Sequence, residues 1–420
     1  MYYCGIDVAK REHEACVLND RGQEVFHQRF KNRRLDADRF VRQLQEKLGA
    51  KPEEVTVVME ATGHYWLNLY GFLTQRGFQV RVLNPIQSDA ARNLYLRKTK
   101  TDARDAFILA DLLRMDRASD SRQPNDGLLR LQALERFRYE LVTRIGSLKQ
   151  RVLGILDRIF PEYETLFSEP FVRSSRELLM NYPTPEELAA ADLSELAALL
   201  SKASRGRLGE EKALEVQHLA RNSFGITLGL DSFALELKLL LAQIEFLEGQ
   251  VETVEAAIDQ ALTEVCAQDK TEEKETQTTA EKSPRHVLET VPGVGPVVLA
   301  TLLGEVPDIS TFINPRRFVA FAGIDASVKE SGEFQGTRMH ISKRGSPYLR
   351  RALWYCAQAA KRCDERFNAY YQRKLQEGKH PKVATVALMR KLAVVIYYIW
   401  RSGKPYDPDY VWKPTPPLSN

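Results

Sequence analysis

The chain has 420 residues, of which 44% are hydrophobic and 28% are charged, and its formal net charge is +4. This length allows two or three domains with substantial cores, and this composition excludes a disordered or fibrous protein. The five cysteines are scattered and show no zinc-site spacing, which suits a reducing cytoplasm. The chain starts on a predicted strand, without a signal peptide, and its longest apolar run near the C-terminus, residues 392–400, is too short to span a bilayer. We therefore expect a cytoplasmic protein with no membrane segment.

Hydrophobic alternation predicts an α/β domain over residues 1–118. Three strands come first, at 2–8, 14–19 and 24–30, with a turn at 20–22 between the second and third. A helix at 37–48, a strand at 55–60, a helix at 65–74, a strand at 79–83 and helices between 86 and 115 follow. Three strands in a meander, followed by alternating helix and strand, is the order of an RNase H-like domain.

Four acidic residues stand where a nuclease of that fold needs them. Asp7 lies in the apolar first strand and Glu60 ends the fourth strand. Asp102 and Asp105 are three residues apart at the start of a helix, so they share one face of it. Carboxylates at two strand ends and on one helix face can converge on a pair of divalent cations such as Mg²⁺, which is the arrangement for in-line displacement at a phosphodiester. A chance placement of acids near strand ends is the alternative, and four matches in the expected order argue against it.

The region 119–267 is predicted to be helical. Its last helix carries a heptad, with Leu or a β-branched residue alternating at spacings of three and four. The heptad positions are Leu237, Ile244, Val251, Ile258 and Val265 at one slot, and Leu240, Leu247, Val254 and Ala261 at the other. This predicts a coiled coil, either with an earlier helix at about 128–160 in an antiparallel hairpin or with a second protomer. Between the two, Thr184-Pro185-Glu186-Glu187 has the cap, the N1 proline and the N3 glutamate of a helix start.

A polar, repetitive stretch at 268–284 predicts a linker to a second compact domain at 285–405, and residues 406–420 form a Pro-rich tail. This C-terminal domain is expected to be mainly α-helical. Its segment 291–296, Val-Pro-Gly-Val-Gly-Pro, resembles the turn of a helix-hairpin-helix motif. Glycines such as Gly293 and Gly295 let backbone amides approach a DNA phosphate. A plain tight turn between two helices is the alternative.

The C-terminal domain is also strongly basic. Between residues 335 and 404 the chain has 16 Lys or Arg against three acids, a local net charge of +13, which indicates a polyanionic partner. The candidate nucleic-acid contacts there are Arg338, Lys343, Arg344, Arg350 and Arg351. In the first domain Lys98 and Lys100 precede Asp102 directly and are further candidates. Charge balance for the carboxylates is their alternative role.

Three serines of this domain are comparable candidates for a nucleophile: Ser331, Ser342 and Ser346. Each lies next to or near a glycine, which makes an exposed and adaptable position. A turn or helix-cap hydroxyl is the ordinary role of such a serine. No histidine stands beside them in the sequence as an obvious base, so an activated serine would depend on the carboxylate–metal site.

Taken together, these motifs resemble the DEDD-type insertion-sequence transposases, serine-containing recombinases guided by a bridge RNA and related to the Piv-type DNA invertases. The matching stretches are 5–10 (GIDVAK), 59–63 (MEATG), 100–106 (KTDARDA), 291–295 (VPGVG), 321–323 (FAG), 330–332 (ESG), 342–345 (SKRG), 349–353 (LRRAL) and 389–393 (MRKLA). They cover both terminal domains. The chain differs from compact members in the segments 161–230 and 268–284, which are longer.

The resemblance implies a RuvC-like domain that holds magnesium through Asp7, Glu60, Asp102 and Asp105, and a covalent phosphoserine intermediate on Ser331. It also implies that both domains meet at one site, contributed by different protomers of a dimer or tetramer, for which the coiled coil is a plausible device. A structured bridge RNA would select donor and target DNA by base pairing. Energy would be kept in the phosphoserine link, and no Walker-type loop is present.

Two other functions compete with this interpretation. A structure-selective nuclease of the junction-resolvase type would use water as the nucleophile, so it would give free ends and no protein–DNA adduct. A non-enzymatic DNA- or RNA-binding assembly factor would bind equally well after Asp7→Asn or Asp102→Asn and would cut nothing. The complete acidic tetrad argues against the second.

Overall fold

The computed structural model describes residues 1–60, 64–83, 101–116, 126–272, 284–306, 308–326, 330–331, 334–335 and 340–411. By residue contacts the chain divides into two units. One unit comprises Met1–Leu128, Val306–Phe321 and Ala393–Lys404, and the other comprises Leu129–Glu305, Ala322–Leu392 and Pro405–Asn420.

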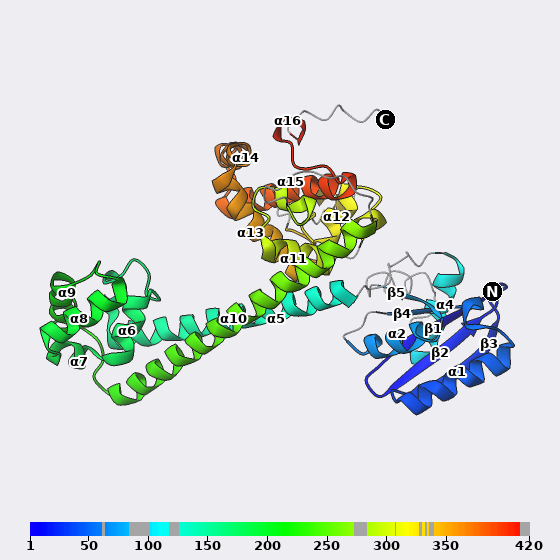
Figure 1. Ribbon diagram of the computed structural model, residues 1–420, viewed down its shortest axis with the longest axis horizontal. Helices are drawn as coiled ribbons and strands as arrows, with labels where there is room; N and C mark the ends of the chain where they lie inside the picture. The colour runs from blue at the N-terminus through cyan, green and yellow to red at the C-terminus, as the bar shows by residue number, and fades with distance from the viewer. Residues whose placement is uncertain are drawn as a thin grey trace. The chain divides into compact units, whose positions relative to one another are not determined.

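The first unit contains a five-stranded mixed sheet of order β3-β2-β1-β4-β5 (Figure 1). Its strands are β1 (Tyr2–Val8), β2 (Glu12–Leu18), β3 (Glu24–Lys31), β4 (Val55–Glu60) and β5 (Gln79–Leu83). The first three strands form an antiparallel meander, whereas β4 pairs in parallel with β1, and β5 with β4. All five strands were predicted, with their ends displaced by two residues at most, and the mixed sheet is compatible with an RNase H-like domain.

Helices cover both faces of this sheet. The helices α1 (Arg34–Leu48) and α2 (Trp66–Thr74) share an apolar layer with the even-numbered residues of β1, among them Cys4 and Ile6. The helix α4 (Asp102–Arg114) packs on the other face, against β1 and β2. Because successive residues of a strand point to opposite faces, the odd-numbered residues of β1 face α4. The short 3-10 helix η1 (Pro52–Glu54) leads into β4. The part of the predicted 86–115 helices before residue 101 lies outside the described residues.

Two long helices, α5 (Asp126–Ile159) and α10 (Leu230–Glu272), form an antiparallel hairpin within the chain. Their direction follows from four ion pairs, in which higher-numbered residues of α5 meet lower-numbered residues of α10: Arg130–Glu264, Arg138–Glu255, Lys149–Glu248 and Arg151–Glu236. The predicted heptad positions of α10 are all buried or half-buried. Of the two pairings expected for the heptad, the structure contains the one inside the chain. The helix runs to Glu272, five residues into the segment predicted as a linker.

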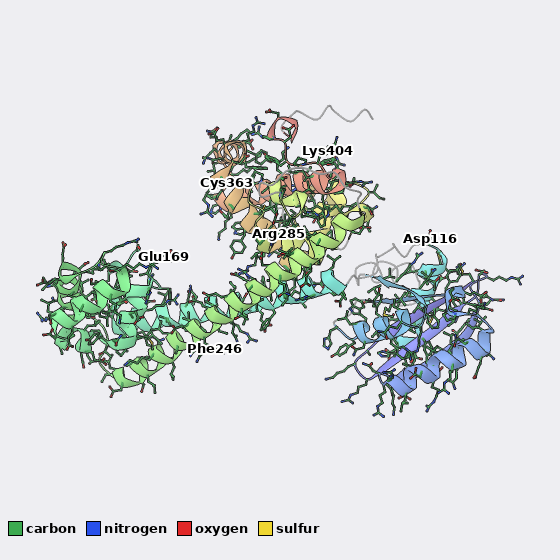
Figure 2. All side chains as sticks on the ribbon, viewed as in Figure 1. Asp116, Glu169, Phe246, Arg285, Cys363 and Lys404 are labelled. Carbon is green, nitrogen blue, oxygen red and sulfur yellow. The ribbon has the colours of Figure 1, made fainter. Side chains whose placement is uncertain are left out.

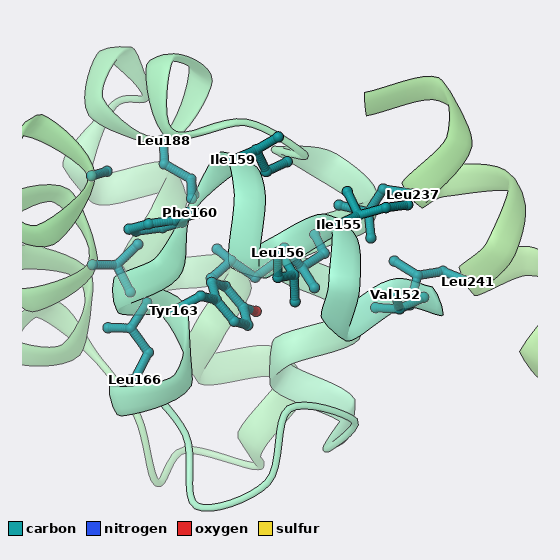
Figure 3. Packing of buried hydrophobic residues seen from close by; sticks show 14 of the residues in the cluster. Val152, Ile155, Leu156, Ile159, Phe160, Tyr163, Leu166, Leu188, Leu237 and Leu241 are labelled. Carbon is teal, nitrogen blue, oxygen red and sulfur yellow. The ribbon is translucent and has the colours of Figure 1, made fainter. Parts of the chain in front are cut away.

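The end of the hairpin carries a helical subdomain, residues 161–229. Its elements are η2 (Pro161–Thr165), α6 (Arg173–Asn181), α7 (Pro185–Ala190), α8 (Leu193–Ser204) and α9 (Glu210–Arg221). Figure 3 shows how Leu156 and Tyr163 pack with Leu188 and with Leu237 of α10 in one apolar core. The predicted start of α7 is confirmed, because the hydroxyl of Thr184 accepts a hydrogen bond from the Glu187 amide.

The chain after residue 284 is mainly helical, as predicted. Its elements are η3 (Val287–Thr290), α11 (Pro296–Glu305), η4 (Ile309–Thr311), α12 (Pro315–Phe321), β6 (Glu330–Ser331), β7 (Phe334–Gln335), α13 (Pro347–Cys363), α14 (Glu365–Gln376), α15 (Pro381–Ser402) and α16 (Pro408–Val411). Arg285, labelled in Figure 2, begins this part beside α10, where it pairs with Asp259 at 2.5 Å and with Glu289 at 3.2 Å.

Among the described residues one helix, α15, is long and apolar enough by length and composition to cross a membrane. The apolar run predicted at 392–400 forms the later part of this helix, and the apolar turns before Arg390 and Lys391 lengthen it. More than half of the apolar window, 56%, is buried within the protein. A mostly buried core helix has the same length and composition, so this helix is weak evidence for a membrane.

Candidate active site

Asp7 and Glu60 end neighbouring strands and face the same side of the sheet. The parallel register pairs Gly5 with Val58 and Ile6 with Met59, and each acid follows the second of these pairs directly. Val58 packs in the apolar cluster under α4, so Glu60, two residues on, also faces that helix. Glu60 is buried and Asp7 is half-buried. The sheet therefore brings these two predicted carboxylates together at one edge and on one face.

The helix α4 carries the other two acids against the same face. Its approach depends on Gly5, where a β-carbon would lie 2.1 Å from the Ala106 carbonyl oxygen. Thr101 caps the helix by accepting a hydrogen bond from the Arg104 amide, and the two acids fall in the first turn, where negative charge is favourable. Asp105 is buried and Asp102 is exposed. The two aspartates share one face of the helix, but only Asp105 is buried against the sheet, whereas Asp102 is open to solvent.

A fifth acid, Glu14, extends this row and was not predicted from the sequence. It lies opposite Asp7 in the β1–β2 register and is buried. Its carboxylate accepts a hydrogen bond of 2.5 Å from Arg29 Nε and lies 2.8 Å from His27 Nε2. An acid directly before the apolar run Ala15-Cys16-Val17, within a predicted strand, was the available signal. The predicted strand included Glu14, but the β1–β2 register that places it opposite Asp7 could not be predicted from the sequence.

Arg29 connects this row to α4. It pairs with Glu14 in the β2–β3 register, and its Nη2 lies 3.8 Å from Asp102 Oδ2. Its hydrogen bond with Glu14 raises the pKa of the guanidinium further above its ordinary range. Arg29 therefore contacts Asp102 of the predicted tetrad. It is held in place by the buried Glu14, which lies opposite Asp7, another member of the tetrad.

The donor chemistry of this edge fits a hard divalent cation, since carboxylate oxygens are the ligands that Mg²⁺ prefers. Asp7, Glu60, Asp102 and Asp105 are all carboxylates on the α4 side of the sheet. Over the part of the chain that the structure describes, however, no three Asp, Glu, His or Cys side chains are grouped closely enough to hold a metal ion. The backbone thus places the acids at one edge, while Asp102 is turned to Arg29.

Two of the three candidate serines hold structural positions in the second unit. Ser342 donates a hydrogen bond to Asp325, and Ser346 caps α13 by accepting from the Leu349 amide while donating to Glu305 at 2.7 Å. Ser331 lies in the two-residue strand β6, where it pairs with Phe334 of β7. Its side chain lies outside the described residues. The role of cap or turn hydroxyl therefore applies to Ser342 and Ser346.

The predicted nucleic-acid contacts fall into three groups. Lys98, Lys100 and Arg338 lie outside the described residues. Arg350 donates to the carbonyls of Ala322 and Gly345, and Arg351 contacts Thr143 and lies over the ring of Tyr139, so both also hold the protein together. Lys343 has a left-handed backbone with φ +54°, and Arg344 beside it is exposed.

The two glycines of the predicted hairpin turn differ from one another. Gly293 has φ +89°, and a β-carbon there would lie 2.4 Å from the carbonyl oxygen of Cys356 in α13. Its presence is thus explained by helix packing. Gly295 is exposed directly before α11 and has open space around it. Only Gly295 leaves room for an outside group.

Comparison with known protein families covers both ends of the chain. A family model described as "Transposase", of the DEDD type found in IS110, matches residues 4–161, and one described as "Transposase IS116/IS110/IS902 family" matches residues 285–372. The first match includes all four carboxylates and the second includes Ser331. Transposase nucleases of the DEDD type generally use divalent metal ions.

Individual relatives agree with these matches. A 43.6 kDa protein of insertion element IS110 from Streptomyces coelicolor is 26% identical over 411 residues, covering 96% of this chain and 95% of its own length. A mini-circle putative transposase for IS117 from the same organism is 23% identical, over 98% of this chain and 97% of its own. A pilin gene-inverting protein of Moraxella bovis is 30% identical over 122 residues, which are 29% of this chain and 38% of that protein. The chain is a DNA transposase or recombinase that belongs to the DEDD-type insertion-sequence transposases of the IS110/IS116/IS902 family.

Proposed function

We propose that this transposase cuts and rejoins DNA strands with Ser331 as the nucleophile and with Mg²⁺ held by Asp7, Glu60, Asp102 and Asp105. A structured bridge RNA is proposed to choose donor and target DNA by base pairing. The observation that carries the proposal is the common edge of Asp7 and Glu60, on the face where Gly5 lets α4 pack closely through Ala106. Two acids at strand ends face the helix that carries two more, and such a set of carboxylate oxygens suits a hard divalent cation.

The proposed chemistry needs no external energy source. The Ser331 oxygen bonds to the phosphorus of the scissile phosphate, the bond from phosphorus to the bridging oxygen breaks, and the leaving strand takes up a proton as a hydroxyl. In rejoining, a strand hydroxyl attacks the phosphoserine, the bond to the serine oxygen breaks, and the serine hydroxyl is regenerated. When bound, the metal would polarise the phosphate and offset developing charge. Because Ser342 and Ser346 already hold Asp325 and Glu305, they are weaker candidates for the attacking group.

The wider organisation is proposed on the same basis. Residues 1–118 would form the RuvC-like catalytic domain, and 285–405 the C-terminal domain that supplies Ser331. The heptad of region 119–267 pairs within the chain, so this region would join protomers of a dimer or tetramer in the cytoplasm through its remaining surface, with the active site completed between protomers. The exposed Lys343, Arg344 and Gly295 remain the best placed of the predicted DNA or RNA contacts.

The test is a search for a covalent protein–DNA adduct. The full chain is expressed with its element's flanking RNA, supplied with labelled donor and target DNA and Mg²⁺, and run on a denaturing gel. Wild type is expected to give an adduct, and both Ser331→Ala and Asp102→Ala are expected to lose it. Ser342→Ala is expected to keep it, which tests the rival serine directly.

Asp20→Asn is the matched control for the carboxylate, because Asp20 is an exposed acid just after β2, at the opposite end of the strands. It should leave the adduct at the wild-type level. Cleavage without any adduct that survives Ser331→Ala would make water the nucleophile and overturn the serine mechanism. Loss of the adduct in Ser342→Ala but not in Ser331→Ala would assign the nucleophile to the other serine.

A further inference from the structure

A pocket of about 450 Å³ opens in the first unit on the face of the sheet opposite the carboxylates. It is lined by β2, by the end of β3 with the start of α1, and by α2. His13 of β2 lines it and lies opposite Val8 of β1, one residue beyond Asp7. Because adjacent strand residues point to opposite faces, the pocket and the carboxylate row share one edge of the sheet but lie on different faces.

The lining of this pocket is strongly basic. It contains Lys31, Arg33, Arg34 and Arg76 and no acidic residue. Arg76 is neutralised by Asp38 and lies over the Phe72 ring, 3.6 Å from its centroid. The side chains of the other three are exposed, and none has an ion-pair partner in the described part of the chain. The pocket therefore carries three uncompensated positive charges around its rim.

His13 supplies an independent observation inside the pocket. It is 1% exposed, and neither of its ring nitrogens has a hydrogen-bond partner in the described structure. An edge-on contact with Phe30, at 5.2 Å between ring centroids, holds the ring in place. Burial lowers the pKa of His13, so the ring is neutral at pH 7 and carries one N–H donor. A weak side-chain hydrogen bond with Asn32, which also lines the pocket, acts in the opposite direction but is too poorly aligned to satisfy a ring nitrogen. A buried donor and acceptor without partners cost free energy, which an oxygen-rich ligand would recover.

The start of α1 adds a third feature. This 15-residue helix is capped by Arg33, whose side chain makes no capping hydrogen bond, although Ser, Thr, Asp or Asn is the usual residue there. The amides of Asp36 and Ala37 bond back to the Arg33 carbonyl, so the amides of Arg34 and Leu35 are the ones in the first turn without a hydrogen-bond partner in the described structure. Arg34 lines the pocket. An open helix N-terminus favours an anion and disfavours the arginine that occupies the cap. Arginine at this position is unfavourable for the helix alone and favourable for an anion site.

We propose that this pocket binds a phosphodiester group of a nucleic-acid backbone, next to but distinct from the phosphate that is cut. A strand that crosses the shared edge of the sheet would be held on one face by the start of α1 and cut on the other. This inference rests on the proposed function, because it requires that the nucleic acid cut at the carboxylates extends across the sheet edge that they share with the pocket. DNA and RNA offer the same phosphodiester, and the experiment separates them.

The experiment measures binding without chemistry. Full-length protein in EDTA is titrated into labelled duplex DNA, single-stranded DNA and the element's flanking RNA, by fluorescence anisotropy at several salt concentrations. Arg33→Gln with Arg34→Gln is expected to weaken binding about tenfold for at least one of these probes and to reduce the salt slope by roughly 1, as for one lost phosphate contact. The probe that is affected identifies the source of the phosphate.

The matched control removes two charges from the same helix away from the pocket. Arg39→Gln with Lys47→Gln, both exposed on α1, should leave binding within about twofold of wild type. His13→Phe is a second variant, which keeps the ring contact with Phe30 but removes both nitrogens. It should weaken binding of the same probe while raising the melting temperature of the free protein, since two unpaired buried nitrogens are gone.

Equal binding by the pocket variant and the control with all three probes would overturn the proposal. A lower melting temperature in His13→Phe, with unchanged binding, would likewise make His13 a structural residue and overturn it. Because the assay needs neither metal nor cleavage, its outcome is separate from that of the adduct experiment. Weakened binding would stand even if no phosphoserine were formed.

Discussion

Gly5 of β1 lies directly against Ala106 of α4, so close that a β-carbon on Gly5 would stand 2.1 Å from the Ala106 carbonyl oxygen. This backbone contact sets how near α4 comes to the sheet. We predict that Gly5→Ala forces the helix away, lowers the stability of the first unit by roughly 2–4 kcal/mol and abolishes adduct formation, since overpacking against backbone has no flexible side chain to yield. Thermal unfolding and the adduct gel would measure both effects.

Gly146→Ala is the comparison for that prediction. Gly146 lies inside α5, and a β-carbon there meets nothing within 4 Å. Alanine should therefore keep activity and stabilise the helix by about 0.5–1 kcal/mol. Full activity in Gly5→Ala would show that the close packing of α4 against Gly5 is not required for activity.

The pair of Arg29 and Glu14 gives a second prediction. Arg29→Gln leaves Glu14 buried with His27 as its remaining partner among the described residues, so we expect a lower free energy of unfolding. The double variant with Glu14→Gln removes the stranded charge and should recover much of that loss. Urea unfolding of wild type, both single variants and the double variant forms a complete cycle. Additive losses would mean that the two side chains are not coupled.

Stability should depend on pH through Glu135 in α5. Burial raises the pKa of this carboxyl to about 7, while Thr301, which donates at 3.1 Å, and Arg138 oppose part of the rise. Between pH 4.5 and 7 the folded chain retains a proton here that the unfolded chain has lost, so this group makes stability fall as the pH rises. Above pH 7 the charged form costs the fold roughly 2–3 kcal/mol.

Glu135→Gln should remove that dependence. The variant is expected to match wild type near pH 4 and to be more stable above pH 7, as measured by urea unfolding at both values. A wild type whose stability rises between pH 5 and 7, with Glu135→Gln falling below it at pH 8, would show that the carboxylate is instead stabilised by its charge.

A fourth prediction concerns Glu305 at the end of α11. This buried carboxylate accepts hydrogen bonds from Arg136 at 2.7 Å and from Ser346, the cap of α13. Arg136→Leu removes its cation, and we expect a cost of about 2–4 kcal/mol and a loosened start of α13. Urea unfolding and hydrogen exchange of the α13 amides would report these two effects.

Arg144→Gln on the same helix is the matched change. It breaks a pair with Glu140 in which both side chains are more than half exposed, so it should cost less than about 0.5 kcal/mol. Equal losses in the two variants would mean that the burial of Glu305 has no energetic consequence.

Much of this fold could be predicted from the sequence, because apolar residues that alternate along a strand or repeat as a heptad along a helix mark the side of that element that is buried. The alternation in β1 and β4 predicted both strands, and the spacing of Asp102 and Asp105 predicted their shared helix face. Glu14 was missed because its importance depends on the β1–β2 register, which places it opposite Asp7. Its partner Arg29 belongs to β3, and no local pattern connects that strand with α4.

The His13 pocket shows the same limit more clearly. A single histidine in an apolar strand has many ordinary explanations in sequence. A ligand-binding role for His13 is suggested only by the fold, which buries the ring beside the start of α1 and leaves both ring nitrogens unsatisfied. The roles of Arg350 and Arg351 changed for the same reason, because contacts with Ala322 and Thr143 are not visible in the basic run that predicted them.

Successive side chains of β1 point to opposite faces of the sheet. The enzyme should therefore be more sensitive to the deletion of a single codon within β1 than to most substitutions there. Its even residues fill the apolar layer under α1, and its odd residues carry Gly5 and Asp7 toward α4. Loss or gain of one codon inside this strand would exchange the two sets, turning Asp7 into the apolar layer and Ile6 toward α4. Copies of such an element with a single codon missing from β1 should therefore be silent, even when all four acidic residues are still encoded.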